Sequence, residues 1–377
     1  MNLVLDGRYI QDHYPGVGRY AFELAAHLAP VSGDDRLLLL RDPVAPNRRF
    51  DIEALAANPR VELLAVSCSP LGLRQHLIVP PLVRRAEGTV YLAPHWGVPK
   101  GLRCPVVLTV HDLTPWLLRE KSEPFWKRWA YQRLLQSAVH RAKAVVVSSQ
   151  ATREDLERLI PRHPPVTVAP LGVGARFHSR SHDVADEGLA GFDVRPPFVL
   201  CVNTNRPHKN LGRLLEAWVR LPEPLREAWQ LVLVGAVDPR WEDPLIHARR
   251  LGAGESVRRL GQVSEGELAA LYAAAEVGVV PSLYEGFGLP ALEMMASGVA
   301  VAVSRRSALP EVVGDAGMLF DPTDVGAIAS ALMSLMTDAA IRELLAAKGR
   351  ERAAAFTWDR TAALVRQAID DALGGRG

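Results

Sequence analysis

The chain has 377 residues, of which 48% are hydrophobic and 23% are charged. This length is too great for one small module, and the composition is that of ordinary globular proteins, so we expect two or three domains. The 44 lysines and arginines nearly balance the 42 aspartates and glutamates, and the resulting net charge of +2 argues against a general nucleic-acid-binding protein.

Cysteine usage and hydropathy indicate the compartment. Cys68, Cys104 and Cys201 are scattered and form no C-x-x-C pair, so neither a disulfide framework nor a zinc site is predicted. Met1–Asp6 lacks the basic region of a signal peptide, and no stretch approaches the ~18 uncharged apolar residues of a transmembrane helix. We therefore expect a cytoplasmic protein whose membrane contact, if it has one, is peripheral at the inner face.

The first half of the chain alternates between short apolar runs and helix-like segments. Helical spacing of apolar residues occurs in Ala21–Leu28 and Lys127–His140. Several of the apolar runs show almost no polar alternation, which is typical of parallel strands covered on both faces. These runs are Asn2–Leu5, Arg36–Leu40, Val61–Val66, Val90–Leu92, Val106–Val110, Ala144–Val147 and Val166–Ala169. The pattern predicts an α/β domain over residues 1–178.

A second series of strands and helices follows a break in the pattern. Phe177–Pro197 is rich in His, Ser, Asp, Gly and Pro, so we place an interdomain linker at 179–197. A second Rossmann-like domain is predicted over 198–355, followed by a C-terminal segment, 356–377, with a helix at Thr361–Leu373. The predicted strands of this domain are Phe198–Val202, Leu231–Gly235, Val257–Leu260, Val277–Pro281 and Ala300–Val303.

The two halves carry opposite charge. Residues 1–178 contain 23 basic and 16 acidic residues, and the remainder contains 21 and 26, for net charges of +7 and −5. The small overall charge is therefore a cancellation.

Two strand-to-helix turns in the second half are candidates for binding a nucleotide sugar. In Tyr284-Glu285-Gly286-Phe287-Gly288-Leu289-Pro290, backbone N–H groups could bind an anion at a helix N-terminus. Glu285 and Glu293, eight residues apart, could each accept sugar or ribose hydroxyls. The alternative is a glycine turn with a solvated Glu285 and with Glu293 complementing the helix dipole.

The second turn, Asn203–Asn210, carries Arg206, His208 and Lys209 directly after a strand. Basic side chains in this position favour a diphosphate, with lysine as a point charge and arginine as a fork. The alternative is a surface turn whose basic side chains are solvated.

Two segments of the first half are also candidates. His111 follows the strand Val106–Val110, at the strand end where α/β sheets bind ligands, although a lone histidine is more often a core or capping residue. Gly16 and Gly18 form a G-x-G-x-x-A pattern, but the polar loop that separates them from the first strand excludes a dinucleotide fingerprint. The segment still predicts a glycine turn at a helix N-terminus.

The segment Phe125–Arg133 is both basic and aromatic. Such a helix could lie on an anionic membrane surface through its tryptophans and cationic side chains. The alternative is an ordinary core stripe with a solvated outer face.

Taken in order, these segments resemble the retaining glycosyltransferases of family four over essentially the whole chain. Glu285 and Glu293 match the family's E-x7-E motif, and Leu309–Gly317 and Leu171–Val173 also look like family segments. The resemblance implies the GT-B fold, an α/β architecture of two Rossmann-like parallel-sheet domains facing a cleft. It also implies a C-terminal helix that crosses back to the first domain.

The resemblance also implies roles for individual residues. His111, Lys209 and Glu285 would be catalytic: His111 beside the donor sugar, Lys209 on the diphosphate and Glu285 on sugar hydroxyls. Many members carry arginine where this chain has Thr204, so Arg206 or His208 would replace that charge. The residues implied to bind the donor are Gly16, Gly18, Arg206, Lys209, Gln262, Val263, Glu285, Gly286, Phe287, Gly288, Leu289 and Glu293, with Gln262 and Val263 at the base and Glu293 at the ribose.

The resemblance implies transfer of a hexose, with mannose first among the candidates, from a nucleoside-diphosphate sugar to a saccharide, lipid-linked or natural-product hydroxyl. GDP-mannose is the expected donor, and no metal or other cofactor is expected. We weigh this against a nonenzymatic nucleotide-sugar-binding or scaffold protein, and against a GT-B-fold epimerase or phosphorolytic enzyme.

Overall fold

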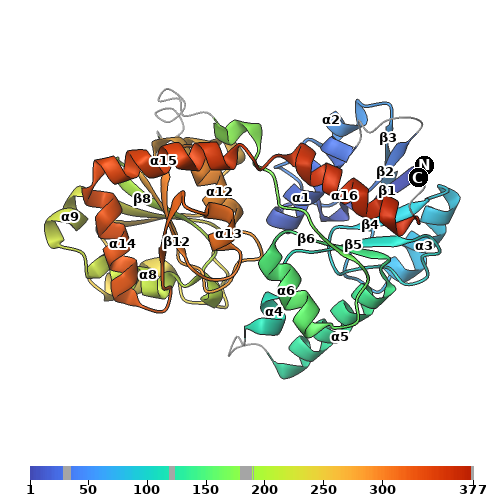
Figure 1. Cartoon of the computed structure of the whole chain (residues 1–377), viewed down its shortest axis with the longest axis horizontal. Coiled ribbons are helices and arrows are strands. Elements are labelled where there is room, and N and C mark those ends of the chain that lie inside the picture. The colour runs from blue at the N-terminus through green and yellow to red at the C-terminus, as the bar shows by residue number, and fades with distance from the viewer. Residues whose placement is uncertain (29–34, 119–123, 179–188, 190, 375–377) are drawn as a thin grey trace. The chain divides into compact units, whose positions relative to one another are not determined.

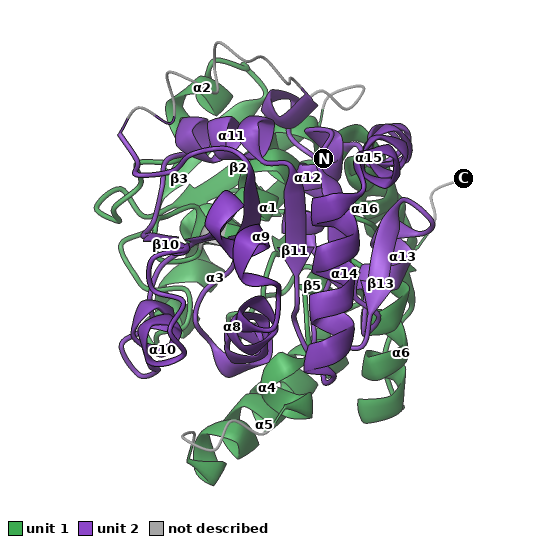
Figure 2. Cartoon of the chain, turned by 90° about the vertical axis from the view of Figure 1, so that its left-hand side faces the viewer, with its two compact units in different colours: residues 1–172, 358–377 green, residues 173–357 purple. Residues whose placement is uncertain are grey.

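The computed structural model describes residues 1–28, 35–118, 124–178, 189 and 191–374. It consists of two compact units (Figures 1 and 2): unit 1 is Met1–Gly172 with Trp358–Gly377, and unit 2 is Val173–Thr357. The units thus divide at 172/173, six residues before the end of the predicted first domain. Most of the predicted linker, 179–188 and 190, lies outside the described residues.

Unit 1 is built on a parallel seven-stranded sheet of order β3-β2-β1-β4-β5-β6-β7. The apolar runs form the strands, and the central strands β4, β5 and β6 are buried throughout, as expected of a parallel sheet covered on both faces, whereas the edge strands β3 and β7 are only partly buried. The strands are β1 Asn2–Leu5, β2 Arg36–Arg41, β3 Val61–Ala65, β4 Val90–Ala93, β5 Val106–Val110, β6 Ala144–Val147 and β7 Val166–Val168. The helices before the chain leaves this unit are η1 Gly7–Tyr9, α1 Pro15–Leu28, α2 Ile52–Ala56, α3 Gln75–Arg85, α4 Thr114–Leu117, α5 Phe125–Arg141 and α6 Gln150–Leu159.

Unit 2 repeats this arrangement with a parallel six-stranded sheet of order β10-β9-β8-β11-β12-β13. Its strands are β8 Phe198–Val202, β9 Gln230–Val234, β10 Val257–Leu260, β11 Val277–Val280, β12 Ala300–Ser304 and β13 Gly317–Phe320. Its helices are η2 Ala175–His178, η3 Pro207–Lys209, α8 Leu211–Val219, α9 Glu223–Ala228, α10 Pro244–Arg250, α11 Glu265–Ala274, α12 Leu289–Ala296, α13 Leu309–Val313, α14 Val325–Thr337 and α15 Ala339–Ala353.

The last helix, α16 Trp358–Ala372, belongs to unit 1, where it packs against α1 and β6 (Figure 1). Its apolar face is buried, with Val365 and Ile369 almost wholly covered. The Thr361 hydroxyl donates a hydrogen bond of 2.6 Å to the carbonyl oxygen of Pro170, and Arg366 pairs with Asp35. The predicted return of the C-terminal helix to the first domain is confirmed, as is the fold of two Rossmann-like sheets.

Strand order decides which loops of each unit lie together. In unit 1, β1 lies between β2 and β4, and in unit 2, β8 lies between β9 and β11. All of these strands are parallel, but the order in which the chain adds strands reverses between β1 and β4 and between β8 and β11. The loops after these strands therefore diverge and open a ligand-binding position at the carboxyl edge.

In the described part of the chain, no single helix is long and apolar enough to cross a membrane. Helix α14 and the helical segment Ala339–Ala372 are long and apolar enough only when they are taken together, and the chain bends by 97° between them.

Candidate active site

The loops after β8 and β11 are joined by a bidentate ion pair between Lys209 and Glu285. The Lys209 Nζ lies 2.7 Å from Glu285 Oε1 and 2.8 Å from Oε2. Both side chains are largely buried, with 19% and 11% of their surface exposed. An ammonium group has three N–H donors, so two are directed to the carboxylate and the third is left for another acceptor.

Asn210 holds the lysine loop against the β11 loop. It adopts a left-handed conformation, with φ of 60°, between η3 and α8. Its buried side-chain amide donates to the carbonyl oxygens of Pro281 and Pro322 at 3.0 and 2.7 Å. The backbone N–H of Leu283 donates to the His208 carbonyl at 2.7 Å. The bonds to Pro281 and from Leu283 fix the spacing of the two loops and therefore of Lys209 and Glu285, and the bond to Pro322 ties Asn210 to the chain after β13.

Two serines orient Glu285. The Ser282 hydroxyl donates to Glu285 Oε1 at 2.6 Å. The backbone N–H of Glu285 donates to Ser307 Oγ at 3.1 Å, and the Ser307 hydroxyl donates back to the Glu285 carbonyl. The carboxylate is thus held by Ser282 of its own loop and by Lys209, while the chain after β12 holds the Glu285 backbone. Glu285 is not the solvated side chain of the alternative interpretation.

The N-terminus of α12 follows directly. Gly288 has φ of 109°, and a Cβ there would lie 2.6 Å from Leu309 Cδ2, so this turn requires glycine for both conformation and space. Phe287 is buried, with its ring edge-on to Phe356 at 6.0 Å. Gly286 is partly exposed, and Leu289 begins the helix. The first N–H groups of α12 provide the partial positive charge that an anion needs.

Glu293, the second member of the E-x7-E pair, lies inside α12 and is only 4% exposed. The Tyr272 hydroxyl donates to Glu293 Oε2 at 2.9 Å. Sequence reasoning did not find Tyr272, because nothing in its own segment marks it as a partner of a residue twenty-one positions later.

The other predicted donor-binding residues of unit 2, Arg206, Gln262 and Val263, differ in exposure and in their contacts. Arg206 is half exposed, and its Nε lies 3.7 Å from Asp238 Oδ2. Asp238 also binds Arg240 at 2.5 Å, and this hydrogen bond, more than Arg206, lowers the pKa of Asp238 to about 2. Gln262 is exposed and Val263 partly so, just before the capping box that begins α11. The roles of Arg206, Gln262 and Val263 in binding stay predictions.

In unit 1, His111 follows β5 as predicted. Its Nε2 lies 2.9 Å from the Pro94 carbonyl oxygen, and its ring is edge-on to Tyr20 at 4.8 Å. A carbonyl accepts only, so Nε2 carries the proton and Nδ1 is left as an acceptor. Burial lowers the pKa of His111 against the opposing effect of Asp112, which favours the neutral ring.

The glycine turn at α1 contains one glycine that the packing requires and one that it does not. A Cβ at Gly18 would lie 2.7 Å from the Tyr9 carbonyl oxygen, so the start of α1 can approach η1 only with glycine at this position. A Cβ at Gly16 would meet nothing within 4 Å, and Gly16 is exposed. Open backbone at Gly16 is compatible with the predicted contact to a ligand.

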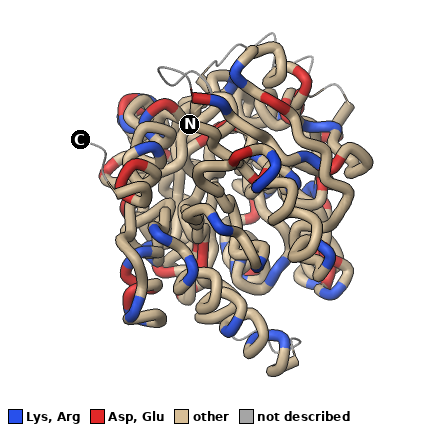
Figure 3. The backbone as a smooth tube through the Cα atoms, turned by 90° about the vertical axis from the view of Figure 1, so that its right-hand side faces the viewer, with Lys and Arg blue, Asp and Glu red and all other residues tan. Residues whose placement is uncertain are grey.

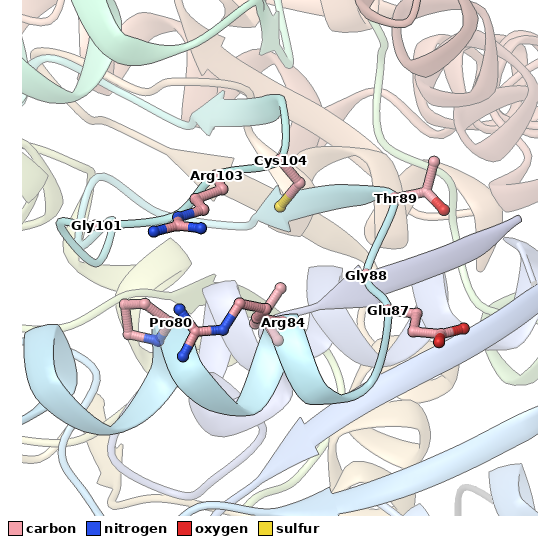
Figure 4. Close-up of a pocket in the computed structure, with 9 residues that line it drawn as sticks. Pro80, Arg84, Glu87, Gly88, Thr89, Gly101, Arg103 and Cys104 are labelled. Atoms are coloured by element: carbon pink, nitrogen blue, oxygen red, sulfur yellow. The ribbon is translucent and has the colours of Figure 1, made fainter.

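Unit 1 also contains a cavity of about 290 Å³ whose lining includes none of the candidate residues (Figure 4). It is lined by the end of α3 and by the chain entering β4 and β5, including Arg84, Arg103 and Cys104. It therefore opens at the amino ends of the strands, opposite to the edge where His111 lies.

Comparisons with known proteins agree with this arrangement. Residues 14–176 match the family described as Glycosyltransferase Family 4, and residues 189–352 match Glycosyl transferases group 1. O-antigen chain mannosyltransferase B of Escherichia coli is 31% identical over 363 residues, which are 92% of this chain and 94% of the relative.

Two solved structures share the fold. Sucrose-phosphate synthase from Thermosynechococcus elongatus has a TM-score of 0.79 at 23% identity, with 98% of both chains covered. Anabaena HepE, in complex with UDP and glucose, has a TM-score of 0.74 at 19% identity, covering 98% of this chain and 99% of HepE. The fold is therefore that of the GT-B glycosyltransferases. The chain belongs to glycosyltransferase family four, as its sequence predicts.

Proposed function

We propose that the chain transfers a hexose, with mannose as the first choice, from a nucleoside-diphosphate donor to an acceptor hydroxyl with retention of anomeric configuration. The observation that carries this proposal is the Lys209–Glu285 pair beside the N-terminus of α12. An ammonium and a helix N-terminus suit a diphosphate, and a fixed carboxylate suits the hydroxyls of a sugar.

In the proposed reaction the bond between the sugar C1 and the diphosphate oxygen breaks while the bond from C1 to the acceptor oxygen forms. Negative charge develops on the departing diphosphate, where Lys209 and the first N–H groups of α12 stabilise it. The acceptor hydroxyl attacks from the face that the diphosphate leaves, and its proton passes to the departing phosphate. We propose that protein cations take the part that a metal plays elsewhere, and that His111 is a further catalytic residue.

The choice of donor rests on relatives. The name of the Escherichia coli relative specifies mannosyl transfer, which supports mannose. HepE binds UDP and glucose, which supports a nucleoside diphosphate as the class of leaving group. We propose GDP-mannose first, and other GDP-, dTDP- and UDP-sugars next. The acceptor is proposed to be a saccharide, lipid-linked or natural-product hydroxyl in polysaccharide biosynthesis or a related pathway.

The test is release of nucleoside diphosphate from a panel of these donors, with and without EDTA, and proton NMR of the linkage formed. The proposal expects release from at least one donor, an anomeric configuration equal to that of the donor, and no loss with EDTA. A protein that binds donors but releases nothing would be the nonenzymatic alternative. Conversion of the donor without transfer would identify the epimerase.

We also propose a peripheral contact with an anionic membrane through the outer face of α5, defined as Phe125, Trp126, Trp129, Arg133 and Leu134. The four apolar side chains of this face are 83%, 56%, 57% and 48% exposed. The Arg133 guanidinium lies 5.4 Å from the Trp129 ring centre. The helix contains four lysines and arginines and no acidic residue (Figure 3). Exposed tryptophans among cations are typical of interfacial helices.

Liposome flotation tests this contact. We expect binding to vesicles rich in phosphatidylserine at low salt, lost in a Trp126→Ser, Trp129→Ser double variant and reduced by high salt. Leu344→Ser is the matched control, because Leu344 is equally exposed, at 57%, in unit 2. Equal flotation of the double variant and the control would contradict the proposal.

A further inference from the structure

A row of six aromatic rings lies at the carboxyl edge of the unit 1 sheet and plays no part in the proposed donor chemistry. The row consists, in spatial order, of His13, Tyr14, Tyr9, His95, Trp96 and Tyr131. Successive ring centres are 4.7, 5.2, 5.2, 5.1 and 5.6 Å apart. These separations are those of aromatic pairs in van der Waals contact.

The loops after β1 and β4 supply most of the row. Tyr9 lies in η1, His13 and Tyr14 follow it, and His95 and Trp96 come directly after β4. Because β1 and β4 pair as neighbouring parallel strands, their carboxyl-end loops must lie together. The row also lies next to the predicted catalytic histidine, because His111 Nε2 bonds the carbonyl of Pro94, the residue before His95.

The rings differ in exposure. Tyr9 is fully buried and anchors the row, whereas Tyr14, His95 and Trp96 are partly open to solvent and His13 is exposed. None of the six side chains is a carboxylate, an ammonium or a guanidinium. The open part of the row is therefore an aromatic surface whose polar atoms are hydroxyl and ring nitrogens.

His95 has an unusual position in the row. Its Nδ1 is buried and has no hydrogen-bond partner among the described residues. Burial, with a smaller effect from His111, lowers the pKa of His95 to about 3, so the ring is neutral at physiological pH. A neutral imidazole offers one donor and one acceptor. A buried polar atom without a partner is costly, and native proteins usually satisfy such an atom with an ordered water or a bound group.

We propose that Tyr14, His95 and Trp96 form an acceptor subsite that binds the pyranose ring of a neutral saccharide. This inference rests on the proposed transferase function and names the class of its acceptor. A pyranose ring presents C–H faces that pack on aromatic rings and edge hydroxyls that hydrogen-bond to an imidazole. An acceptor bound through a phosphate would need a cation, and the row contains no lysine or arginine.

Binding without a donor tests the subsite directly. Saturation-transfer NMR with the methyl glycosides of α-mannose, β-galactose and N-acetyl-β-glucosamine should show transfer to the ring protons of at least one glycoside. We expect Trp96→Leu to weaken binding at least tenfold and Trp96→Phe to weaken it less. His95→Phe keeps a ring in the row but removes both nitrogens, and should also weaken binding.

Trp116→Leu is the matched control. Trp116, like Trp96, is partly buried against the hydrophobic core of unit 1, but it is not in the row. The Trp116→Leu variant should therefore bind the glycosides as the wild type does. Thermal unfolding of each variant shows that it is folded. Equal binding by wild type, Trp96→Leu and His95→Phe would overturn the proposal. So would binding of dodecyl phosphate but of no glycoside, or of none of these probes at millimolar concentration.

Kinetics separate this inference from the proposed function. With a working donor and acceptor, the Trp96 and His95 variants should raise the acceptor KM about tenfold and change the donor KM much less, whereas Trp116→Leu should change neither KM. If the wild type releases nucleoside diphosphate from no donor, the transferase proposal fails while glycoside binding can still stand. If transfer occurs and the acceptor KM does not move, the subsite fails alone.

Discussion

Replacing Lys209 by methionine tests the centre of the proposed site. Methionine keeps a long unbranched side chain but removes the ammonium that binds both oxygens of Glu285 at 2.7 and 2.8 Å. Loss of one preorganised group at a developing negative charge costs about 3–4 kcal/mol in the transition state. We therefore expect kcat for release of nucleoside diphosphate to fall by about 10²–10³.

The same variant changes stability by a smaller amount. Exposed ion pairs are worth about 0–1 kcal/mol, and breaking a fully buried one costs about 3–5 kcal/mol. The Lys209–Glu285 pair, with 19% and 11% exposure, lies between these limits, and Ser282 still binds Glu285 in the variant. We expect a coupling of about 1–3 kcal/mol in a Lys209→Met, Glu285→Gln double-mutant cycle measured by urea unfolding.

Lys348→Met is the matched control. Lys348 also pairs with a carboxylate at 2.7 Å, that of Asp315, but both side chains are exposed. This variant should keep wild-type kcat and nearly wild-type stability. The reasoning is refuted if Lys209→Met retains kcat within about threefold of the wild type while folded, or if both lysine variants lose activity equally.

Three further predictions concern the surrounding structure. Asn210→Ala should lower the free energy of unfolding by about 2–4 kcal/mol in urea titration, because it leaves two buried carbonyls unpaired and places alanine at φ of 60°. Gly288→Ala should cost about 1–3 kcal/mol and weaken calorimetric binding of GDP, because a Cβ would strain the turn that begins α12; unchanged GDP affinity would contradict the role of this turn. Burial lowers the pKa of His95 to about 3 from an ordinary value near 6.5, so the unfolded chain binds the proton first as pH falls. Neutral His95 therefore does not lower the free energy of unfolding above about pH 7.5, but should lower it by about 2 kcal/mol at pH 5. The decline in the free energy of unfolding between these pH values should be smaller in His95→Phe.

Local pattern was sufficient for the architecture and for the positions of the main candidates. Buried parallel strands are continuous apolar runs, so β5 and β8 can be recognised without any knowledge of their neighbours. His111, Lys209 and Glu285 could be placed at strand ends for the same reason. The E-x7-E spacing is likewise local, since it puts one glutamate before α12 and the other inside it.

The contacts of those residues could not be read from the pattern. Nothing near Arg206 shows that it lies by Asp238, and nothing near Asn210 shows that its amide bridges two distant carbonyls. His95 and Trp96 could not be predicted, because rings that come from η1, two loops and α5 have no fixed spacing in the sequence. Each of these features depends on which strands are neighbours.

The sequence by itself thus determined the α/β alternation, the family, and the chemical groups available at each strand end. Only the tertiary structure decided that the loops after β8 and β11, which are not consecutive, would lie together and pair Lys209 with Glu285 across 76 positions of sequence. The physical reason is that whether a segment becomes a strand depends on its own apolar pattern and backbone preference. Strand order follows from how whole helices and strands pack, which no single segment encodes.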